Sequence, residues 1–193
     1  MHSTMLTFFR NNYYKNKSEL SNTVKNCEKV YKTMKRAFRI GFSFGLPSGI
    51  VTTLGLMVGL NATTQSHFVV IGGILTIAIC DSLSDAMGMH FAQESENHLS
   101  QKDVWKSTFF TFLAKLIFSS IFILPVLIFE LTTAIILSVM IGLYLIFNIS
   151  LIIARERNDD PLRVISSHLI ITLIVIILAH YAGLWISATF AYF

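Results

Sequence analysis

The sequence predicts an all-α integral membrane protein with five transmembrane helices, its N-terminus in the cytosol and its C-terminus outside. First, 53% of the 193 residues are hydrophobic and only 13% are charged, about half the charged share of a soluble domain. Second, the apolar residues form five runs of about 20–25 residues, each long enough to cross a hydrocarbon core of about 30 Å as a helix. Third, lysine and arginine gather at alternate ends of these runs.

Residues 1–37 form the predicted cytosolic segment, which is polar and rich in lysine. No apolar core follows its first charges, so it is not a secretory signal peptide. We expect either a short helix on the membrane surface, where basic side chains meet anionic lipid, or a loosely ordered tail. The positive-inside rule explains this charge, and we expect no nucleic acid as a partner.

Residues 38–193 form the predicted five-helix transmembrane domain. The spans are placed near 38–60, 68–92, 107–129, 131–154 and 164–190. Outside the spans, basic residues occur in the N-terminal segment and in the second and fourth loops, but not in the first and third loops or at the C-terminus. An odd number of spans then places the two termini on opposite sides. Lys115, inside the third span, is the exception and either reaches toward the cytosol or faces the bundle.

The first span contains a glycine repeat. Gly41, Gly45 and Gly49 recur every four residues, so they share one helix face that lets another helix approach closely, inside the bundle or across a dimer axis. Pro47 cannot donate to the carbonyl of Ser43 and is expected to kink the helix.

Two carboxylates interrupt the second span in the stretch "CDSLSDAMGMH". Asp81 lies near the membrane midplane, and Asp85 follows four residues later on the same helix face. Each ionised aspartate at this depth costs about 2.5–3.5 kcal/mol. Either Lys115 pairs with one of them and the set only locks helices together, or the two carboxylates bind a cation, exchange protons, or do both.

The types of ligand near the two aspartates indicate which cation they would bind. A site of Asp81, Asp85 and the Met89 sulfur, completed from the first span by Ser48 and by the carbonyl of Ser43, would suit Fe²⁺ or Mn²⁺. Toward the cytosol, His90, Glu94 and Glu96 are candidates for the mouth through which the metal arrives. The alternatives are a structural histidine and a solvated helix end.

The stretches "GLPSGIVTTLGLMVGL" and "GGILTIAICDSLSDAMGMHFAQESE" resemble the first two spans of the vacuolar iron transporter family. The resemblance covers roughly residues 36–96; the later spans match only in number and length. It implies a five-span protein with a cytosolic N-terminus that works as a homodimer in the lipid bilayer. It also implies export of ferrous iron or manganese by proton antiport.

The chain departs from the family pattern at the carboxylates. Alignment without gaps places Ser48 at the family's first-span aspartate and Asp85 at its second-span glutamate, while Asp81 replaces a methionine. One carboxylate is therefore lost from the first span and one is gained on the second. "ESENHLSQKDVWK" is too short for the Glu-rich cytosolic insert of the plant and parasite members, so this chain would be a short, divergent member.

The predicted function is therefore export of Fe²⁺ or Mn²⁺ from the cytosol, with the metal as substrate and no cofactor. The chain carries no nucleophile triad, phosphate loop or nucleotide motif, so we expect no enzyme. The membrane would be the inner or plasma membrane in a prokaryote, or an endomembrane or vacuole in a eukaryote. One alternative is a non-transporting scaffold or regulatory protein with a transporter-like fold; another is transport of a different solute, such as an organic one.

Overall fold

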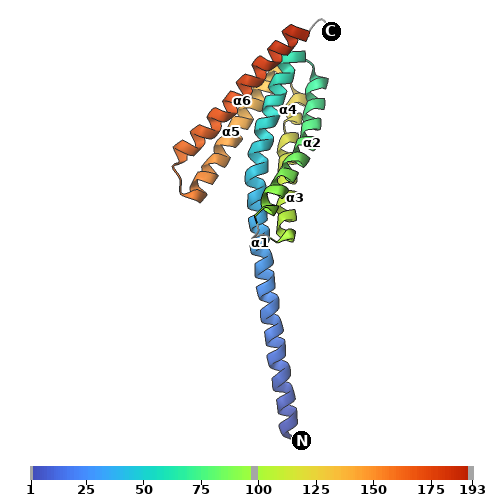
Figure 1. The fold of residues 1–193 in the computed structure, drawn as a ribbon, viewed down its shortest axis with the longest axis vertical. Helices are drawn as coiled ribbons and strands as arrows, with labels where there is room; N and C mark the ends of the chain where they lie inside the picture. The colour runs from blue at the N-terminus through green and yellow to red at the C-terminus, as the bar shows by residue number, and fades with distance from the viewer. Residues whose placement is uncertain (1, 97–99, 191–193) are drawn as a thin grey trace.

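The computed structural model describes residues 2–96 and 100–190, with side chains at Lys25 and from Glu28 onward (Figure 1). The chain is 93% helical and the described ranges contain no strand. Five helical segments are long and apolar enough to cross a membrane, one for each predicted span. The helices are α1 (His2–Thr64), α2 (His67–Glu94), α3 (Gln101–Ser120), α4 (Ile123–Ile128), α5 (Leu131–Arg157) and α6 (Pro161–Phe190). The predicted all-helical fold is confirmed, with five helices that could span a membrane by their length and composition, while the sidedness of the termini stays a prediction.

Helix α1 is the centre of the molecule. It contacts α2, α3, α5 and α6, and Figure 1 shows it running through the body and projecting beyond it. Its 63 residues join the basic segment to the first span without a turn, so the structure has neither a separate surface helix nor a loose tail there. Residues 2–40 contain no glycine or proline that would end a helix. Pro47 lies within α1 without ending it.

The third span is made of two helices. α3 ends at Ser120 and the short α4 begins at Ile123. Pro125 has no N–H to donate to the carbonyl of Ile121; the N–H of Leu124 donates to that carbonyl instead, at 3.3 Å. The span therefore changes from one helix to another near its far end.

A tight turn joins α5 to α6. Asn158 adopts a left-handed conformation (φ 54°), and its N–H reaches the carbonyls of Ala154 and Arg155. Asp160 then accepts a hydrogen bond from the N–H of Leu162 at 3.1 Å, and Pro161 is the first residue of α6. The two helices form an antiparallel hairpin whose turn lies on the same side of the body as the projecting part of α1 (Figure 1).

Glycines bring α1 close to two other helices. A Cβ at Gly41 would lie 2.6 Å from the backbone nitrogen of Thr111, and one at Gly45 would lie 2.7 Å from the carbonyl oxygen of Thr111. The glycine repeat therefore faces α3 inside the bundle. Near the other end of α1, a Cβ at Gly183 would meet the carbonyl oxygen of Gly59, so α6 is held closely there.

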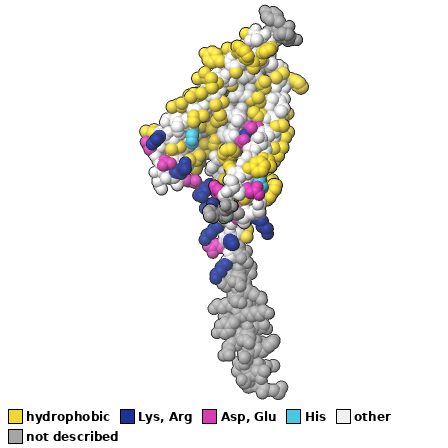
Figure 2. Space-filling model, in the orientation of Figure 1, with side chains coloured by type: hydrophobic (Ala, Val, Ile, Leu, Met, Phe, Trp, Pro, Cys, Tyr) yellow, Lys and Arg dark blue, Asp and Glu magenta, His cyan; other side chains and the backbone are white. Residues whose placement is uncertain are grey.

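The outer surface of the helices is apolar. Large exposed side chains such as Phe68, Ile136 and Leu178 point away from the core, and hydrophobic side chains cover most of the body in Figure 2. The charged side chains concentrate where α1 projects and at the α5–α6 turn (Figure 2). Such a surface fits a multi-pass membrane protein.

Candidate functional site

The two aspartates of α2 meet a lysine from α3 and a serine from α1. The Lys115 Nζ lies 2.5 Å from the Asp81 Oδ2 as an ion pair and donates a hydrogen bond to the Asp85 Oδ2. It also donates to the Ser48 Oγ at 3.0 Å, and the Ser48 hydroxyl donates to the Asp85 Oδ2 at 2.7 Å. We call Ser48, Asp81, Asp85 and Lys115 the charge cluster.

The glycine repeat of α1 positions the lysine. A Cβ at Gly49 would lie 3.1 Å from the carbonyl oxygen of Lys115 and 3.2 Å from its Cγ. A Cβ at Gly45 would lie 3.3 Å from the backbone nitrogen of Lys115. A larger residue at either position would push α3 away from α1, so the glycines allow the lysine to reach the carboxylates of α2.

Burial makes the cluster electrostatically important. Lys115 is fully buried (0% exposed), whereas the Asp81 and Asp85 side chains keep 28% and 22% of their area exposed. Two carboxylates and one ammonium leave one net negative charge if all are ionised. Asp81 is the fifteenth of 28 residues in α2, so this charge lies near the middle of a span.

The structure brings together part of the predicted metal site. Asp81, Asp85 and Ser48 are in the cluster, and Lys115 faces the bundle and pairs with both carboxylates. Met89 lies one turn beyond Asp85 and is partly buried, but it makes none of the polar contacts of the cluster. Ser43 lines a cavity on another side of α1.

Two of the predicted mouth residues lie close together, with the His90 Nε2 3.8 Å from the Glu94 Oε2, but no ion pair or hydrogen bond joins the Glu96 side chain to either. His90 is buried, its Nδ1 lies 3.1 Å from the Thr108 Oγ1, and its ring lies 4.6 Å from that of Trp105. Glu94 is exposed and accepts a hydrogen bond from Gln101 at 2.9 Å. Glu96 is exposed at the end of α2. These contacts fit a structural histidine and a solvated helix end.

Among the described side chains, those of Lys25, residues 28–96 and residues 100–190, no three or more histidines, cysteines, aspartates or glutamates gather as metal ligands. The cluster offers two carboxylates and one hydroxyl, so a bound cation would need water or other groups to complete its coordination.

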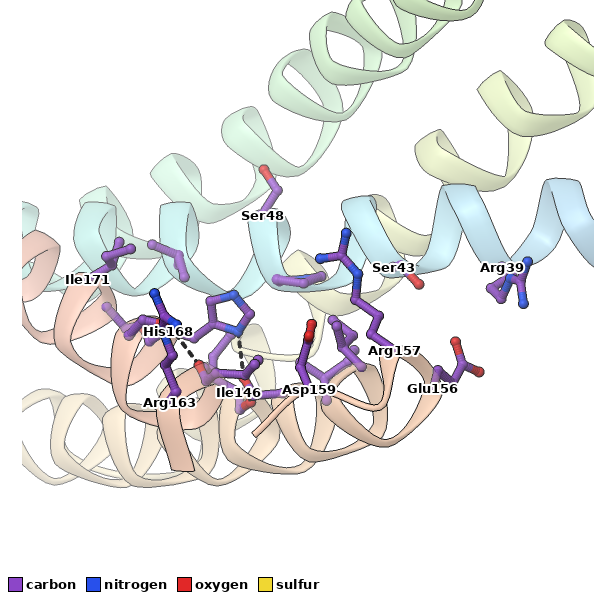
Figure 3. A pocket seen from close by; sticks show the side chains of 18 of the residues that line it. Arg39, Ser43, Ser48, Ile146, Glu156, Arg157, Asp159, Arg163, His168 and Ile171 are labelled. Carbon is purple, nitrogen blue, oxygen red and sulfur yellow. Dashed lines mark hydrogen bonds between the residues drawn. The ribbon is translucent and has the colours of Figure 1, made fainter. Parts of the chain in front are cut away.

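A cavity of about 1180 Å³ lies on the other side of α1, between α1, α5 and α6 (Figure 3). Ser48 belongs both to the charge cluster and to the lining of this cavity, although Figure 3 shows its side chain pointing away from the α5–α6 hairpin. His168, whose Nδ1 lies 2.8 Å from the Ser150 Oγ, is in its wall. No local sequence pattern predicts this cavity, although Ser167 and His168 are polar residues within the fifth span.

Comparison of the chain with models of protein families, with curated proteins and with solved structures finds no match.

Proposed function

We propose that this protein is a transmembrane transporter that exports Fe²⁺ or Mn²⁺ from the cytosol in exchange for protons. The observation that supports this most is the charge cluster near the middle of the spans. Ionisable groups at this depth are costly, and in membrane proteins they commonly belong to ion pathways or proton relays.

The cluster suggests how exchange would work. The Oδ2 atoms of Asp81 and Asp85 both face the Lys115 ammonium, so a cation and this ammonium would compete for the same oxygens. When Lys115 withdraws, two carboxylates and the Ser48 hydroxyl become available, and these hard oxygen ligands suit Mn²⁺. Return of the ammonium, or arrival of protons at the carboxylates, would then release the metal.

A second candidate function is supported by the same ion pairs. A fully buried lysine between two carboxylates satisfies most of their charge and could hold three helices together permanently. The protein would then be a scaffold or regulatory protein with a transporter-like fold. This alternative predicts no metal affinity.

The homodimer that the family resemblance implies would need a surface other than the glycine repeat of α1, because that repeat packs against α3. The outward face of α2 presents small exposed residues every four positions: Gly72, Thr76, Cys80, Ser84 and Gly88. A Cβ at Gly72 or Gly88 would meet nothing within 4 Å, so this face has room for a second helix. Oxidative cross-linking through Cys80 in a Cys27→Ser chain tests the arrangement, and its failure in native membranes would argue against it.

Uptake of Mn²⁺ into proteoliposomes, followed with an enclosed fluorescent chelator under a pH gradient, tests the proposed function. We expect Asp81→Asn and Asp85→Asn to reduce uptake to the background of empty vesicles. Asp103→Asn is the matched control, because Asp103 pairs with Lys106 at 3.5 Å outside the cluster. Full uptake by both cluster variants would refute the site. Wild-type protein with neither Mn²⁺ uptake nor Mn²⁺ or Fe²⁺ binding at neutral pH would favour the scaffold.

A further inference from the structure

The cavity between α1 and the α5–α6 hairpin carries charges of both signs at its mouth. Three arginines come from three helices: Arg39 on α1, Arg157 at the end of α5 and Arg163 in the first turn of α6. Three carboxylates, those of Glu156, Asp159 and Asp160, line the same mouth. Among the side chains that the structure describes, none of these arginines forms an ion pair with a carboxylate.

The orientation of these groups leaves them free to meet a ligand. Figure 3 shows Arg157, Asp159 and Arg163 directed across the cavity toward α1. Asp160 is already engaged, since it accepts the N–H of Leu162. A guanidinium binds phosphate through paired hydrogen bonds, and a carboxylate accepts hydrogen bonds from an ammonium. The mouth therefore fits a ligand that carries a phosphate and a primary ammonium close together.

The uncharged part of the cavity wall is compatible with a hydrocarbon chain. Ile40, Val51, Ile146, Ile149 and Ile171 contribute apolar surface. Several wall hydroxyls already donate within their own helices: Thr52 to the carbonyl of Ser48 at 2.9 Å, Ser150 to that of Ile146 at 2.7 Å and Thr172 to that of His168 at 2.8 Å. Because these hydroxyl protons are satisfied, an acyl chain along the wall leaves none of them without an acceptor.

The position and size of the cavity also fit a lipid. Its mouth lies at the turn where α5 ends and α6 begins, at the end of two spans, which is the level of lipid headgroups. Its volume of about 1180 Å³ exceeds the usual range of about 300–1,000 Å³ for a small-molecule pocket. In Figure 1 the hairpin diverges from α1 toward this turn.

We propose that this cavity binds one phospholipid with a phosphoethanolamine headgroup. The phosphate lies against Arg157 and Arg163, the ammonium against Asp159, and an acyl chain along the isoleucines. The equal number of basic and acidic residues at the mouth favours this zwitterionic headgroup over an anionic one. The lipid contacts proposed here use none of the charge-cluster side chains, although Ser48 also lines the cavity, so the proposal does not depend on metal transport.

Lipid retention tests the proposal. The full-length protein is reconstituted in equal amounts of phosphatidylethanolamine, phosphatidylcholine and phosphatidylglycerol with matched chains, re-extracted, and analysed by native mass spectrometry. We expect the wild type to retain phosphatidylethanolamine in preference to the other two. Arg157→Gln with Arg163→Gln should lower retention about tenfold, as expected for loss of charge-assisted hydrogen bonds. Arg155→Gln, on the same helix but outside the cavity, should not.

Two further variants separate the headgroup from the chain. Asp159→Asn should shift retention from phosphatidylethanolamine toward phosphatidylglycerol, because the ammonium loses its carboxylate. Ile149→Trp should fill the wall and reduce retention of all three lipids, whereas Ile152→Trp, at an exposed position on the same helix, should not. Thermal unfolding confirms that each variant is folded.

Several results would overturn the proposal. These are equal retention of the three lipids by the wild type, preference for phosphatidylglycerol, or retention unchanged by the arginine double variant and by Ile149→Trp. If free phosphoethanolamine binds as tightly as the lipid, the acyl chain contributes nothing to binding and that part of the proposal is wrong.

Discussion

Replacing Lys115 by methionine is the most direct test of the energetics of the charge cluster. The substitution keeps most of the side-chain volume and removes the ammonium. It deletes the ion pair to Asp81, the hydrogen bond to Asp85 and the hydrogen bond to Ser48. Two carboxylates one helical turn apart are left without their cation.

The expected size of the effect follows from these contacts. Removing one partner of a buried ion pair costs about 3–5 kcal/mol, because the other charge stays buried and unpaired. Asp85→Asn should cost less, about 1.5–3 kcal/mol, since Lys115 keeps Asp81 as its partner. The triple variant K115M/D81N/D85N should return to within about 1 kcal/mol of the wild type, because no buried charge remains.

The assay is reversible unfolding in mixed micelles, titrated with a denaturing detergent and followed by circular dichroism. Lys106→Met is the control, because Lys106 pairs with Asp103 at a site where both side chains are about one-third exposed, and such pairs contribute about 0–1 kcal/mol. A cost for Lys115→Met similar to that of Lys106→Met would refute this account of the cluster. So would a triple variant as unstable as the single one.

Other predictions concern packing, metal affinity and orientation. Gly41→Ala should destabilise the protein by about 1–3 kcal/mol in thermal unfolding, because its Cβ would meet the backbone of α3. Gly72→Ala, in open space, should be neutral or stabilising by up to about 1 kcal/mol. Equal losses of stability in the two variants would contradict this account of the packing. Ser48→Asp adds a third carboxylate to the cluster, so the metal-free protein should lose stability through repulsion between like charges. Excess Mn²⁺ should restore that stability by binding the folded protein. No effect of Mn²⁺ on the stability of this variant would count against a metal site. In chains without native cysteines, Glu130→Cys should react with an impermeant maleimide from outside and Lys102→Cys only after permeabilisation; the reverse pattern would invert the topology.

Long apolar runs and rare charges within them are local signals, so the sequence alone predicts the five spans and singles out Asp81 and Asp85, whose role in a metal site stays a prediction. The side chain that pairs with these carboxylates does not follow from the local sequence. Lys115 had two possible orientations, and the structure selects one through the contact of Gly45 and Gly49 with α3. That contact is tertiary, so hydropathy cannot reveal it.

The cavity and the length of α1 also differ from the sequence-based expectation, for two physical reasons. The cavity depends on the divergence of the α5–α6 hairpin from α1, which leaves no local pattern. The sequence does contain a pattern that favours an unbroken α1, since no glycine or proline occurs before Gly41. The high polarity of that segment instead suggested a boundary at residue 37.

The unbroken α1 also has a mechanical consequence. At 1.5 Å per residue, its 63 residues form a rod about 95 Å long, of which much projects beyond the other helices (Figure 1). A force applied to the projecting end is transmitted along the helix as torque, since no flexible joint absorbs it. The rod should bend most easily at Pro47, where a backbone hydrogen bond is missing. Ser48 is the next residue, so the pivot of this lever lies beside the Lys115–Asp85 contact.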